Sequence, residues 1–471
     1  MFERLKQRIS GFFDTPNASP EKKGGVRHQP RPHFIQRSID ANSRAPRTQD
    51  FGRLNEINSE INAANENVRQ RARYLALNDP HVANGLDTFV AEATGTGARP
   101  SPSGDDGQPE IIERFEAWGE TCGHDGENWP GIQAMAALDL KRDGETLWLI
   151  NDTPAGLKLQ HLDVARIDTS KTSFHHDRNE NFVNSGVEFD KSGQITAYWI
   201  RQYLDQFDVW NHAGLGSPHT IRIPARQVIH VVDRKFAGQV RGLSSLACII
   251  LPANDLAALM DASRMAAKMS SMIAAFVRNP EAQAIDLGDL DNAEFLPGSI
   301  LNIGNYEIEF SNPQGTQNID RYISIHLRQI ASGLGMPSWM IDNLFERINY
   351  SSSRSGLIPF RRRVEQWRET TLLPQFHNRI WNRWAGMEFL QGNTRTVMPG
   401  AGWIWPAWEN VDPLKSVQAV VSQIEAGILD RETAIRMLHG SNAERIIGNL
   451  NGEIDGTRYQ PSHLNLIPGG R

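Results

Sequence analysis

The chain has 471 residues and a formal net charge of −6, with 39% hydrophobic and 22% charged residues. At roughly 150 residues per domain, this length predicts two to four structural units with ample sequence for a core. A pI near 6.2 excludes a general nucleic-acid-binding domain of the basic kind, which usually exceeds a pI of about 9.

The two cysteines, Cys122 and Cys248, lie far apart in the sequence, which excludes a disulfide framework and fits a reducing compartment. Residues 1–13 carry charges throughout and no apolar segment, so we expect no secretory signal there. No run of about 18 apolar residues occurs, so we expect no membrane span. Residues 1–50 contain ten basic and five acidic residues and predict a short amphipathic helix followed by an arm, either disordered or a peripheral binding arm.

Helices are predicted in the next hundred residues, because apolar residues recur there at helical spacing. The first two helices, separated by the break at residues 78–80, carry two apolar faces: Val68, Ala72, Leu75 and Leu77, then Val82, Leu86, Phe89 and Val90. Gly95-Thr96-Gly97 ends the second helix; it lacks the third glycine of a dinucleotide loop and follows no strand. Residues 98–108 predict a surface loop, and residues 111–118 and 129–141 predict two more helices.

From residue 145 the apolar period changes to two, which predicts strands. The predicted strands are residues 146–150, 157–162, 187–189, 195–203, 220–223 and 228–232. Residues 190–193, Asp-Lys-Ser-Gly, predict a hairpin turn. An antiparallel sheet with helices on one side is the expected packing.

Residues 244–277 predict an unusually long helix, with Pro252 separating a short first part from the main one. Met265, Met269, Met272 and Phe276 form a stripe among many alanines. Small residues permit close helix approach and Met adapts to irregular gaps, so a helix that packs against copies of itself is one interpretation and an ordinary core helix is the other. Residues 278–318 predict an irregular excursion with strands at 299–303 and 306–310, and a second helix begins at Ile319 and stops at residues 335–337.

Residues 342–384 predict a polar, Ser-rich loop (342–355) that opens into a long amphipathic helix. The buried face is expected to hold Phe360, Val364, Trp367 and Thr371, then Leu373, Phe376, Ile380 and Trp384. A kink is expected at Pro374, which lacks an N–H. The opposite side is expected to carry Arg361, Arg362, Arg363 and Arg368.

Residues 321–384 contain ten Arg, no Lys and four acidic residues, so this segment carries +6 and the remainder of the chain carries −12. A basic inner segment in an acidic chain indicates either a contact with anions or a solvated helix face. After residue 384 we expect a strand near residues 396–398 and small helices at 414–426, 430–438 and 442–450, the second capped by Asp430.

No motif for catalysis stands out. The chain has no phosphate-binding loop of the ATPase type and no complete nucleophile elbow. Cys122, His124 and Asp125 lie together, as do His175, His176 and Asp177. A lone triplet without a spaced partner pair is usually a polar loop. We therefore expect no catalytic residues, no metal and no cofactor, although the two triplets could converge in space.

Several stretches in the same order resemble phage portal proteins of the lambda-type family. They are residues 78–97 (NDPHVANGLDTFVAEATGTG), 142–145 (RDGE), 186–199 (GVEFDKSGQITAYW), 223–245 (IPARQVIHVVDRKFAGQVRGLSS), 330–342 (IASGLGMPSWMID), 349–357 (NYSSSRSGL), 412–415 (DPLK) and 427–429 (GIL). The similarity covers about residues 50–450. No single stretch is decisive, but their shared order is specific.

The resemblance implies an α+β portal fold that assembles as a ring, typically of twelve subunits, at one vertex of a capsid. Its parts would be an N-terminal arm (1–50), a wing (51–252 and 356–410), two stem helices (253–277 and 319–341), a clip (278–318), a tunnel loop (342–355) and a crown with the C-terminal tail (411–471). The implied partners are double-stranded DNA passing non-specifically, the large terminase subunit, head-completion proteins, capsid and scaffold, with no membrane. The implied location is the virion, with the host cytoplasm during assembly.

Two sets of site residues follow from this assignment. The tunnel-loop residues expected to face DNA are Arg347, Asn349, Tyr350, Ser351, Ser352, Ser353 and Arg354. The residues expected at subunit interfaces are Met265, Met269, Met272, Arg361, Arg362 and Arg363. Arg347 and Arg354 either touch phosphates weakly, without reading bases, or pair with acids of a neighbouring subunit.

Two other functions compete with the conduit. One is a metal-dependent DNA-processing enzyme, with the His, Cys and Asp triplets as ligands and the arginine helix holding substrate. The other is a monomeric adaptor that binds another protein through its Met-rich helix. A net charge of −6 per subunit suits a conduit through which DNA must slide, because each phosphate contact adds affinity that has to be broken at every step.

Overall fold

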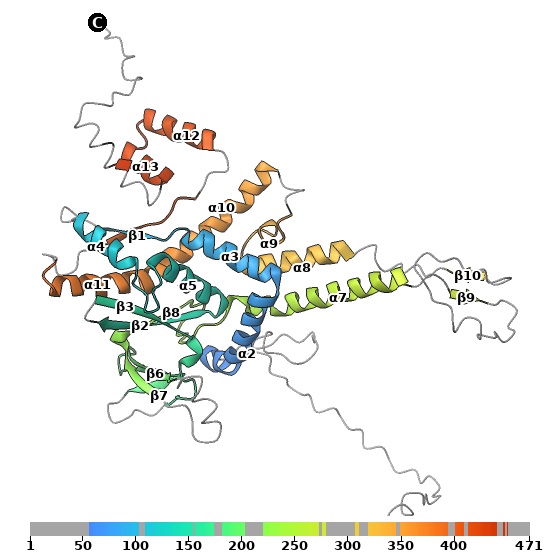
Figure 1. Cartoon of the computed structure of the whole chain (residues 1–471), viewed down its shortest axis with the longest axis horizontal. Coiled ribbons are helices and arrows are strands. Elements are labelled where there is room, and N and C mark those ends of the chain that lie inside the picture. The colour runs from blue at the N-terminus through green and yellow to red at the C-terminus, as the bar shows by residue number, and fades with distance from the viewer. Residues whose placement is uncertain are drawn as a thin grey trace, which may run out of the picture. The chain divides into compact units, whose positions relative to one another are not determined.

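The computed structural model describes residues 56–102, 109–153, 156–173, 181–202, 220–272, 276–278, 307–309, 319–344, 349–393, 401–408, 413–439, 446–447 and 450. These residues all lie within one compact unit, residues 37–471. The fold is of the predicted α+β class, with helices and antiparallel strands (Figure 1). Within the described ranges, no helix has both the length and the apolar character needed to cross a membrane.

Helices α2 (Ile57–Asn78) and α3 (Pro80–Thr94) meet at Asp79, which ends one helix and caps the next. The Asp79 carboxylate accepts hydrogen bonds from the backbone N–H groups of His81 and Val82, and Pro80 occupies the first helical position, where its missing N–H costs nothing. The predicted apolar faces are buried except for Val90, which is partly buried, and Leu77, which is 83% exposed. Leu77 follows Leu75 by two residues and therefore points to the other side of the helix.

An aromatic core joins helices that are far apart in the sequence. Phe115 of α4 (Pro109–Gly119) contacts Trp129 of α5 (Trp129–Arg142) and Trp384 of α11 (Asn378–Leu390), with ring centroids 5.7 and 5.1 Å away. Beside this core, β1 (Arg99–Pro102) pairs antiparallel with β11 (Ala401–Ile404). The prediction of a surface loop at residues 98–108 is therefore wrong for its first part. The expected strand at 396–398 lies outside the described residues.

The strands between residues 145 and 232 form two sheets, where the sequence predicted one. The first has the order β3 (Gly156–Leu162), β2 (Glu145–Thr153), β8 (Val228–Val232); the second has the order β4 (Phe182–Asn184), β5 (Val187–Phe189), β6 (Ile195–Arg201), β7 (Thr220–Pro224). All pairings within these two sheets are antiparallel. The six predicted strands are confirmed, β4 was missed, and the expected turn between β5 and β6 is present.

Alternate residues of β2 and β8 explain why two sheets form. Trp148 and Ile229 join the apolar cluster of the helices, whereas Leu147 and Val228 join a second cluster with Tyr198 of β6. All five residues of β8 are buried. The first sheet is thus covered by helices on one face and by residues of the second sheet on the other (Figure 1).

Helices α7 (Ile250–Met272) and α8 (Ile319–Leu334) pack against each other. The short 3-10 helix η5 (Ser245–Cys248) precedes α7, so the break falls at Ile249 and not at Pro252, which lies in the first turn of α7 where proline is tolerated. Gly333 permits the crossing of α8 over this region, because a Cβ there would lie 2.1 Å from Ile249 Cγ2.

Between α7 and α8, the strands β9 (Phe276–Arg278) and β10 (Glu307–Glu309) pair antiparallel. Phe276 therefore lies in a strand and does not continue the predicted helical stripe. The strand expected at 306–310 is confirmed by β10, and the one expected at 299–303 lies outside the described residues.

A long helical stretch follows the short helix α9 (Trp339–Asp342). It comprises α10 (Tyr350–Trp367), the π-helical segment η8 (Arg368–His377) and α11. The distortion expected at Pro374 takes the form of this π-helix, in which the Asn378 N–H bonds to the Leu373 carbonyl five residues back. The predicted buried face is confirmed, except that Leu372 is buried where Leu373 was expected.

Two helices end the described chain, α12 (Pro413–Glu425) and α13 (Arg431–His439). Asp430 caps α13 as predicted, since its carboxylate accepts a hydrogen bond of 2.8 Å from the Thr433 N–H. Of the helix expected at 442–450, only residues 446, 447 and 450 are described.

Candidate functional site

The polar stretch predicted as a tunnel loop is helical from residue 350 onward. Asn349 Oδ1 accepts a hydrogen bond from the Ser352 N–H at 2.9 Å, and Ser352 Oγ accepts one from the Asn349 N–H at 3.1 Å. This reciprocal capping box starts α10, so Ser351, Ser352, Ser353 and Arg354 belong to a helix. The loop prediction is therefore wrong for its second part. Arg347 and the side chain of Tyr350 lie outside the described residues.

Nine of the ten arginines of the basic segment lie in the described residues, and they divide into two groups. Four are bonded within the chain: Arg361 pairs with Glu92 at 3.1 Å, Arg383 pairs with Asp152, and Arg368 and Arg379 donate to backbone carbonyls. Across the ranges that the structure describes, no carboxylate lies within ion-pair distance of five others, all exposed: Arg321, Arg328, Arg354, Arg362 and Arg363. The second group supplies the charge that is available to a partner.

Arg328 and Arg363 lie on the same surface cavity of about 260 Å³, which is bounded by α8, the connection at residues 335–338 and α10. Ser332, Ser338 and Gly356 complete much of its lining. Arg363 also donates to the Gly335 carbonyl at 3.0 Å. Of the three arginines expected at a subunit interface, Arg361 is the one that pairs with a carboxylate among the described residues of the chain.

Arg368 does not face solvent with Arg362, as the helical period predicted, but is 4% exposed. Its guanidinium lies 4.7 Å from the Trp405 ring and 4.6 Å from the Trp408 ring, and it donates to the Ala93 carbonyl at 2.6 Å. The cation thus satisfies the carbonyl end of α3, where positive charge is favoured. The tryptophans that cover it come from a distant segment, so the local pattern carried no signal for its burial.

The outer parts of α7 and α8 leave apolar side chains uncovered. No side chain of residues 257–268 or 319–326 is buried in the described part of these helices. Met265 is 60% exposed and Tyr322 is 56% exposed. The side chains of Met269 and Met272, the other members of the predicted stripe, lie outside the described residues. Two helices side by side cannot bury both flanks of each other, so these surfaces are open to a partner.

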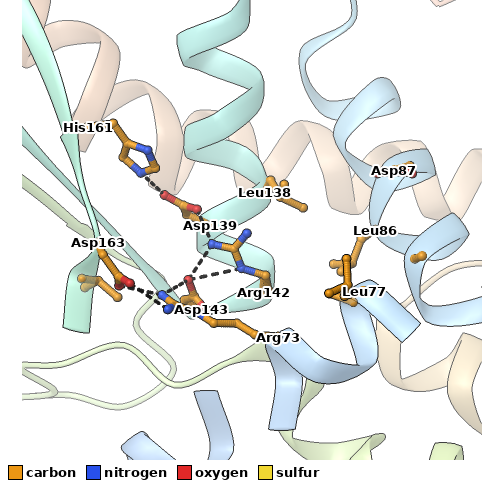
Figure 2. A pocket seen from close by; sticks show the side chains of 13 residues that line it. Arg73, Leu77, Leu86, Asp87, Leu138, Asp139, Arg142, Asp143, His161 and Asp163 are labelled. Atoms are coloured by element: carbon orange, nitrogen blue, oxygen red, sulfur yellow. Dashed lines mark hydrogen bonds and ion pairs between the residues drawn. The ribbon is translucent and has the colours of Figure 1, made fainter. Parts of the chain in front are cut away.

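A network of ion pairs lines a surface cavity of about 510 Å³ beside α2 and α5 (Figure 2). Arg73 bridges Asp143 and Asp163, at 2.9 and 2.7 Å, and Arg142 pairs with Asp139 and Asp143. Burial is the largest single influence and would raise the pKa of Asp163, but the hydrogen bonds from Arg73 and from the Ala165 N–H, together with the charges of Arg73 and Arg69, outweigh it and lower the pKa to about 2. Each carboxylate is held by a cation, so the network fastens α2 to α5 and to the end of β3 without offering a free acid or base.

A second, fully buried cluster joins the two sheets. Arg241 donates to Glu145 of β2 at 2.6 Å, to the Ser185 carbonyl between β4 and β5, and to the Val164 carbonyl. His230 of β8 lies 3.0 Å from the other oxygen of Glu145. Burial would raise the pKa of Glu145, but the charge of Arg241 and the hydrogen bond with His230 hold it well below its usual range.

The stretches Arg-Asp-Gly-Glu (142–145) and Arg-Gly-Leu (241–243) meet at this junction. Gly144 has a φ of +84°, and a Cβ there would lie 2.3 Å from the Leu243 backbone. The Gly242 N–H donates to Glu145 at 2.7 Å. Glycine is therefore required at 144, and the two stretches fit each other as one structural element. The sequence pattern did not indicate that they were paired.

The first candidate metal-ligand triplet, Cys122, His124 and Asp125, gains no support from the structure. Burial raises the pKa of the Cys122 thiol to about 12, which keeps it protonated and a poor ligand. In the portions of the chain that the structure describes, no group of three or more His, Cys, Asp or Glu side chains is placed to hold a metal ion. His175, His176 and Asp177 lie outside those portions.

Comparison with known proteins gives consistent matches. A family model described as "Phage portal protein, lambda family" matches residues 45–368. A probable portal protein of Halomonas phage phiHAP-1 is 22% identical, over 95% of this chain and 90% of that protein.

Two solved structures are similar at low identity. One is a chain from the neck of a native gene transfer agent particle computed with C12 symmetry (11% identity, TM-score 0.47, covering 79% of this chain and 94% of that one). The other is an HK97 family phage portal protein from Corynebacterium diphtheriae (12% identity, TM-score 0.33, covering 61% and 83%).

Proposed function

The chain belongs to the lambda family of phage portal proteins, and from this premise we propose that it assembles as a ring of twelve copies, through which double-stranded DNA enters and leaves a capsid. The ring would occupy one capsid vertex in the virion and would assemble in the host cytoplasm. It would dock the large terminase subunit, head-completion proteins, capsid and scaffold. We propose no catalytic role, because the family is structural.

The main observation in favour of the ring is that the outer parts of α7 and α8 expose apolar side chains. Met265, Tyr322 and Ile325 are exposed there, although each is large and apolar. Exposed apolar side chains that gather on paired helices mark a contact with another molecule. Identical copies arranged around an axis would cover these flanks with a heterologous contact that closes on itself.

The parts of the portal follow the chain order in this proposal. Residues 51–252 and 356–410 form the wing, and residues 253–277 and 319–341 form the stem. Residues 278–318, which include β10 and the last residue of β9, form the clip that docks the terminase. Residues 342–355 face the channel as the tunnel segment, of which residues 350–355 are the start of α10 and not a loop. Residues 411–471 form the crown, and residues 1–50 remain an arm. The capping box at Asn349 supports a fixed starting point for α10 next to the channel.

The exposed arginines support a weak contact with DNA. Arg328, Arg354 and Arg362 carry charge that no carboxylate of the described chain neutralises. Arginine side chains on helices can approach phosphates without reading base edges, as a conduit for any sequence requires. The net charge of −6 per chain limits the total attraction, so DNA can slide.

Replacing Arg328, Arg354 and Arg362 together by Gln is expected to weaken the affinity of assembled rings for a short DNA duplex and to flatten its dependence on salt. The slope of log K against log salt should fall in magnitude by about 0.9 for each phosphate that the variant no longer neutralises. Fluorescence anisotropy with a labelled duplex over a salt series measures this slope.

Arg383→Gln is the matched control, because Arg383 is already paired with Asp152. This variant should leave the slope unchanged. Equal slopes for the triple variant and the parent, with rings intact in both, would remove these arginines from the path of the DNA.

A further inference from the structure

A cavity of about 260 Å³ lies where α3, α5, η5, α8 and α10 meet. Its polar lining consists of Lys141, Lys235, Arg363, Asp233 and Ser245, together with the indole of Trp367. Three cations face one carboxylate there, so the cavity carries an excess of positive charge. It is distinct from the arginine-lined cavity described above, although Arg363 stands between the two.

Lys141 is the innermost of these cations. Its ammonium lies 4.4 Å from the centre of the Phe89 ring, 4.7 Å from that of Trp367 and 3.7 Å from a carboxylate oxygen of Asp233. A distance of 3.7 Å exceeds that of a charge-assisted hydrogen bond, so Asp233 compensates the charge incompletely. Burial lowers the pKa of Lys141 to about 8, and the nearby charge of Lys235 acts in the same direction.

Trp367 adds an unused hydrogen-bond donor. The residue is 8% exposed, and its Nε1–H is buried without an acceptor among the residues that the structure describes. A buried donor without an acceptor costs about 1–3 kcal/mol. The lining offers one carboxylate, that of Asp233, against three cations, so a second carboxylate would balance the remaining charge.

We propose that this cavity, the Lys141 cavity, receives the side-chain carboxylate of an Asp or Glu from a neighbouring copy of the chain. The proposal rests on the ring proposed above and identifies one contact within it. The side chains of Lys141 and Trp367 are recessed, so a slender acidic side chain reaches them more readily than the backbone of a DNA duplex. Of the lining cations, Arg363 belongs to residues 321–384, which carry +6, whereas Lys141 and Lys235 belong to the rest of the chain, which carries −12. The chain thus has an excess of acidic residues outside the basic segment, and a heterologous contact can bring one of them to this cavity of the next copy.

Lys141→Met tests this contact. Met keeps an unbranched side chain against Phe89 and Trp367 but removes the charge. The association constant of subunits into rings, measured by mass photometry over a salt series, is expected to fall about tenfold or more. Arg363→Gln changes an exposed residue at the cavity mouth and should weaken association in the same direction without affecting folding. Lys191→Met, in the exposed β5–β6 turn, is the matched control and should assemble like the parent.

Zero-length carbodiimide cross-linking identifies the occupant directly. Rings are mixed from copies with normal and heavy nitrogen, so that mass spectrometry separates links between copies from links within one copy. We expect Lys141 to be joined to an Asp or Glu of another copy.

The proposal fails if the parent forms rings but both variants assemble with unchanged affinity, or if Lys141 links only to Asp233. If the two variants still formed rings with unchanged affinity but bound DNA more weakly, the occupant would be a phosphate group. That result would also overturn the proposal of a carboxylate. If the parent protein forms no ring at all, the proposed function itself fails. The mass of the parent in solution reveals this without any variant, so the two failures can be told apart.

Discussion

Arg241→Met is expected to lower the free energy of unfolding by about 3–5 kcal/mol, because it leaves the buried carboxylate of Glu145 without its cation. Arg241 is 1% exposed and Glu145 is fully buried. The variant also loses the hydrogen bonds to the Ser185 and Val164 carbonyls, which connect the two sheets. Denaturation by urea, followed by circular dichroism, measures the change.

Two further variants show whether the charge causes the loss. Arg241→Met combined with Glu145→Gln should recover part of the stability, since no unpaired buried charge remains. Arg264→Met breaks an ion pair with Asp261 whose side chains are 74% and 72% exposed, and it should change stability by less than about 1 kcal/mol. If Arg241→Met were as mild as Arg264→Met, Arg241 would not hold the sheets together.

The second large effect is a dependence of stability on pH that arises from His377. His377 is fully buried, and burial lowers its pKa to about 3. In the unfolded chain its pKa is about 6.5. Below about pH 6.5 the imidazole is therefore protonated in the unfolded state but not in the folded state. As the pH falls, the free energy of unfolding decreases by about 1.4 kcal/mol per pH unit until the folded-state pKa is reached.

Between pH 7 and pH 5 this group alone should cost about 2 kcal/mol of stability. His377→Gln removes the titrating group. The variant should therefore lose about 2 kcal/mol less unfolding free energy than the parent between pH 7 and pH 5. This difference does not depend on how stable the variant is at pH 7. His124→Gln, in an exposed turn, should run parallel to the parent. Parallel curves for His377→Gln and the parent would show that His377 has the same pKa in the folded and unfolded states, which would contradict this account.

The sequence predicted elements that have a strong local pattern. The helices α2, α3, α5 and α8 begin and end close to the predicted residues, because apolar spacing, the caps at Asp79 and Gly335 and the glycines after α3 are all local signals. The buried face of α10 and η8 was also found from its period. The start of α10 was missed, because Asn349 and Ser352 have the composition of a loop and their capping box uses Ser in place of the usual Glu or Gln.

Features that depend on distant partners could not be predicted in this way. The strand pattern does not say which strands pair, so the division into two sheets was not visible. Arg368 carries the same local signal as Arg362, but Trp405 and Trp408 cover only Arg368. The positive charge of residues 321–384 was predicted from counting, whereas its division into paired and unpaired arginines depends on Glu92 and Asp152, far away in the chain.

Electron microscopy of the purified protein tests the ring most directly. We expect a closed ring with a central opening wide enough for a DNA duplex and a mass near twelve times 52.8 kDa, in which Met265 and Tyr322 lie buried between adjacent copies. A monodisperse single chain whose α7 and α8 are shielded by its own residues, with no opening in any assembly, would contradict the account.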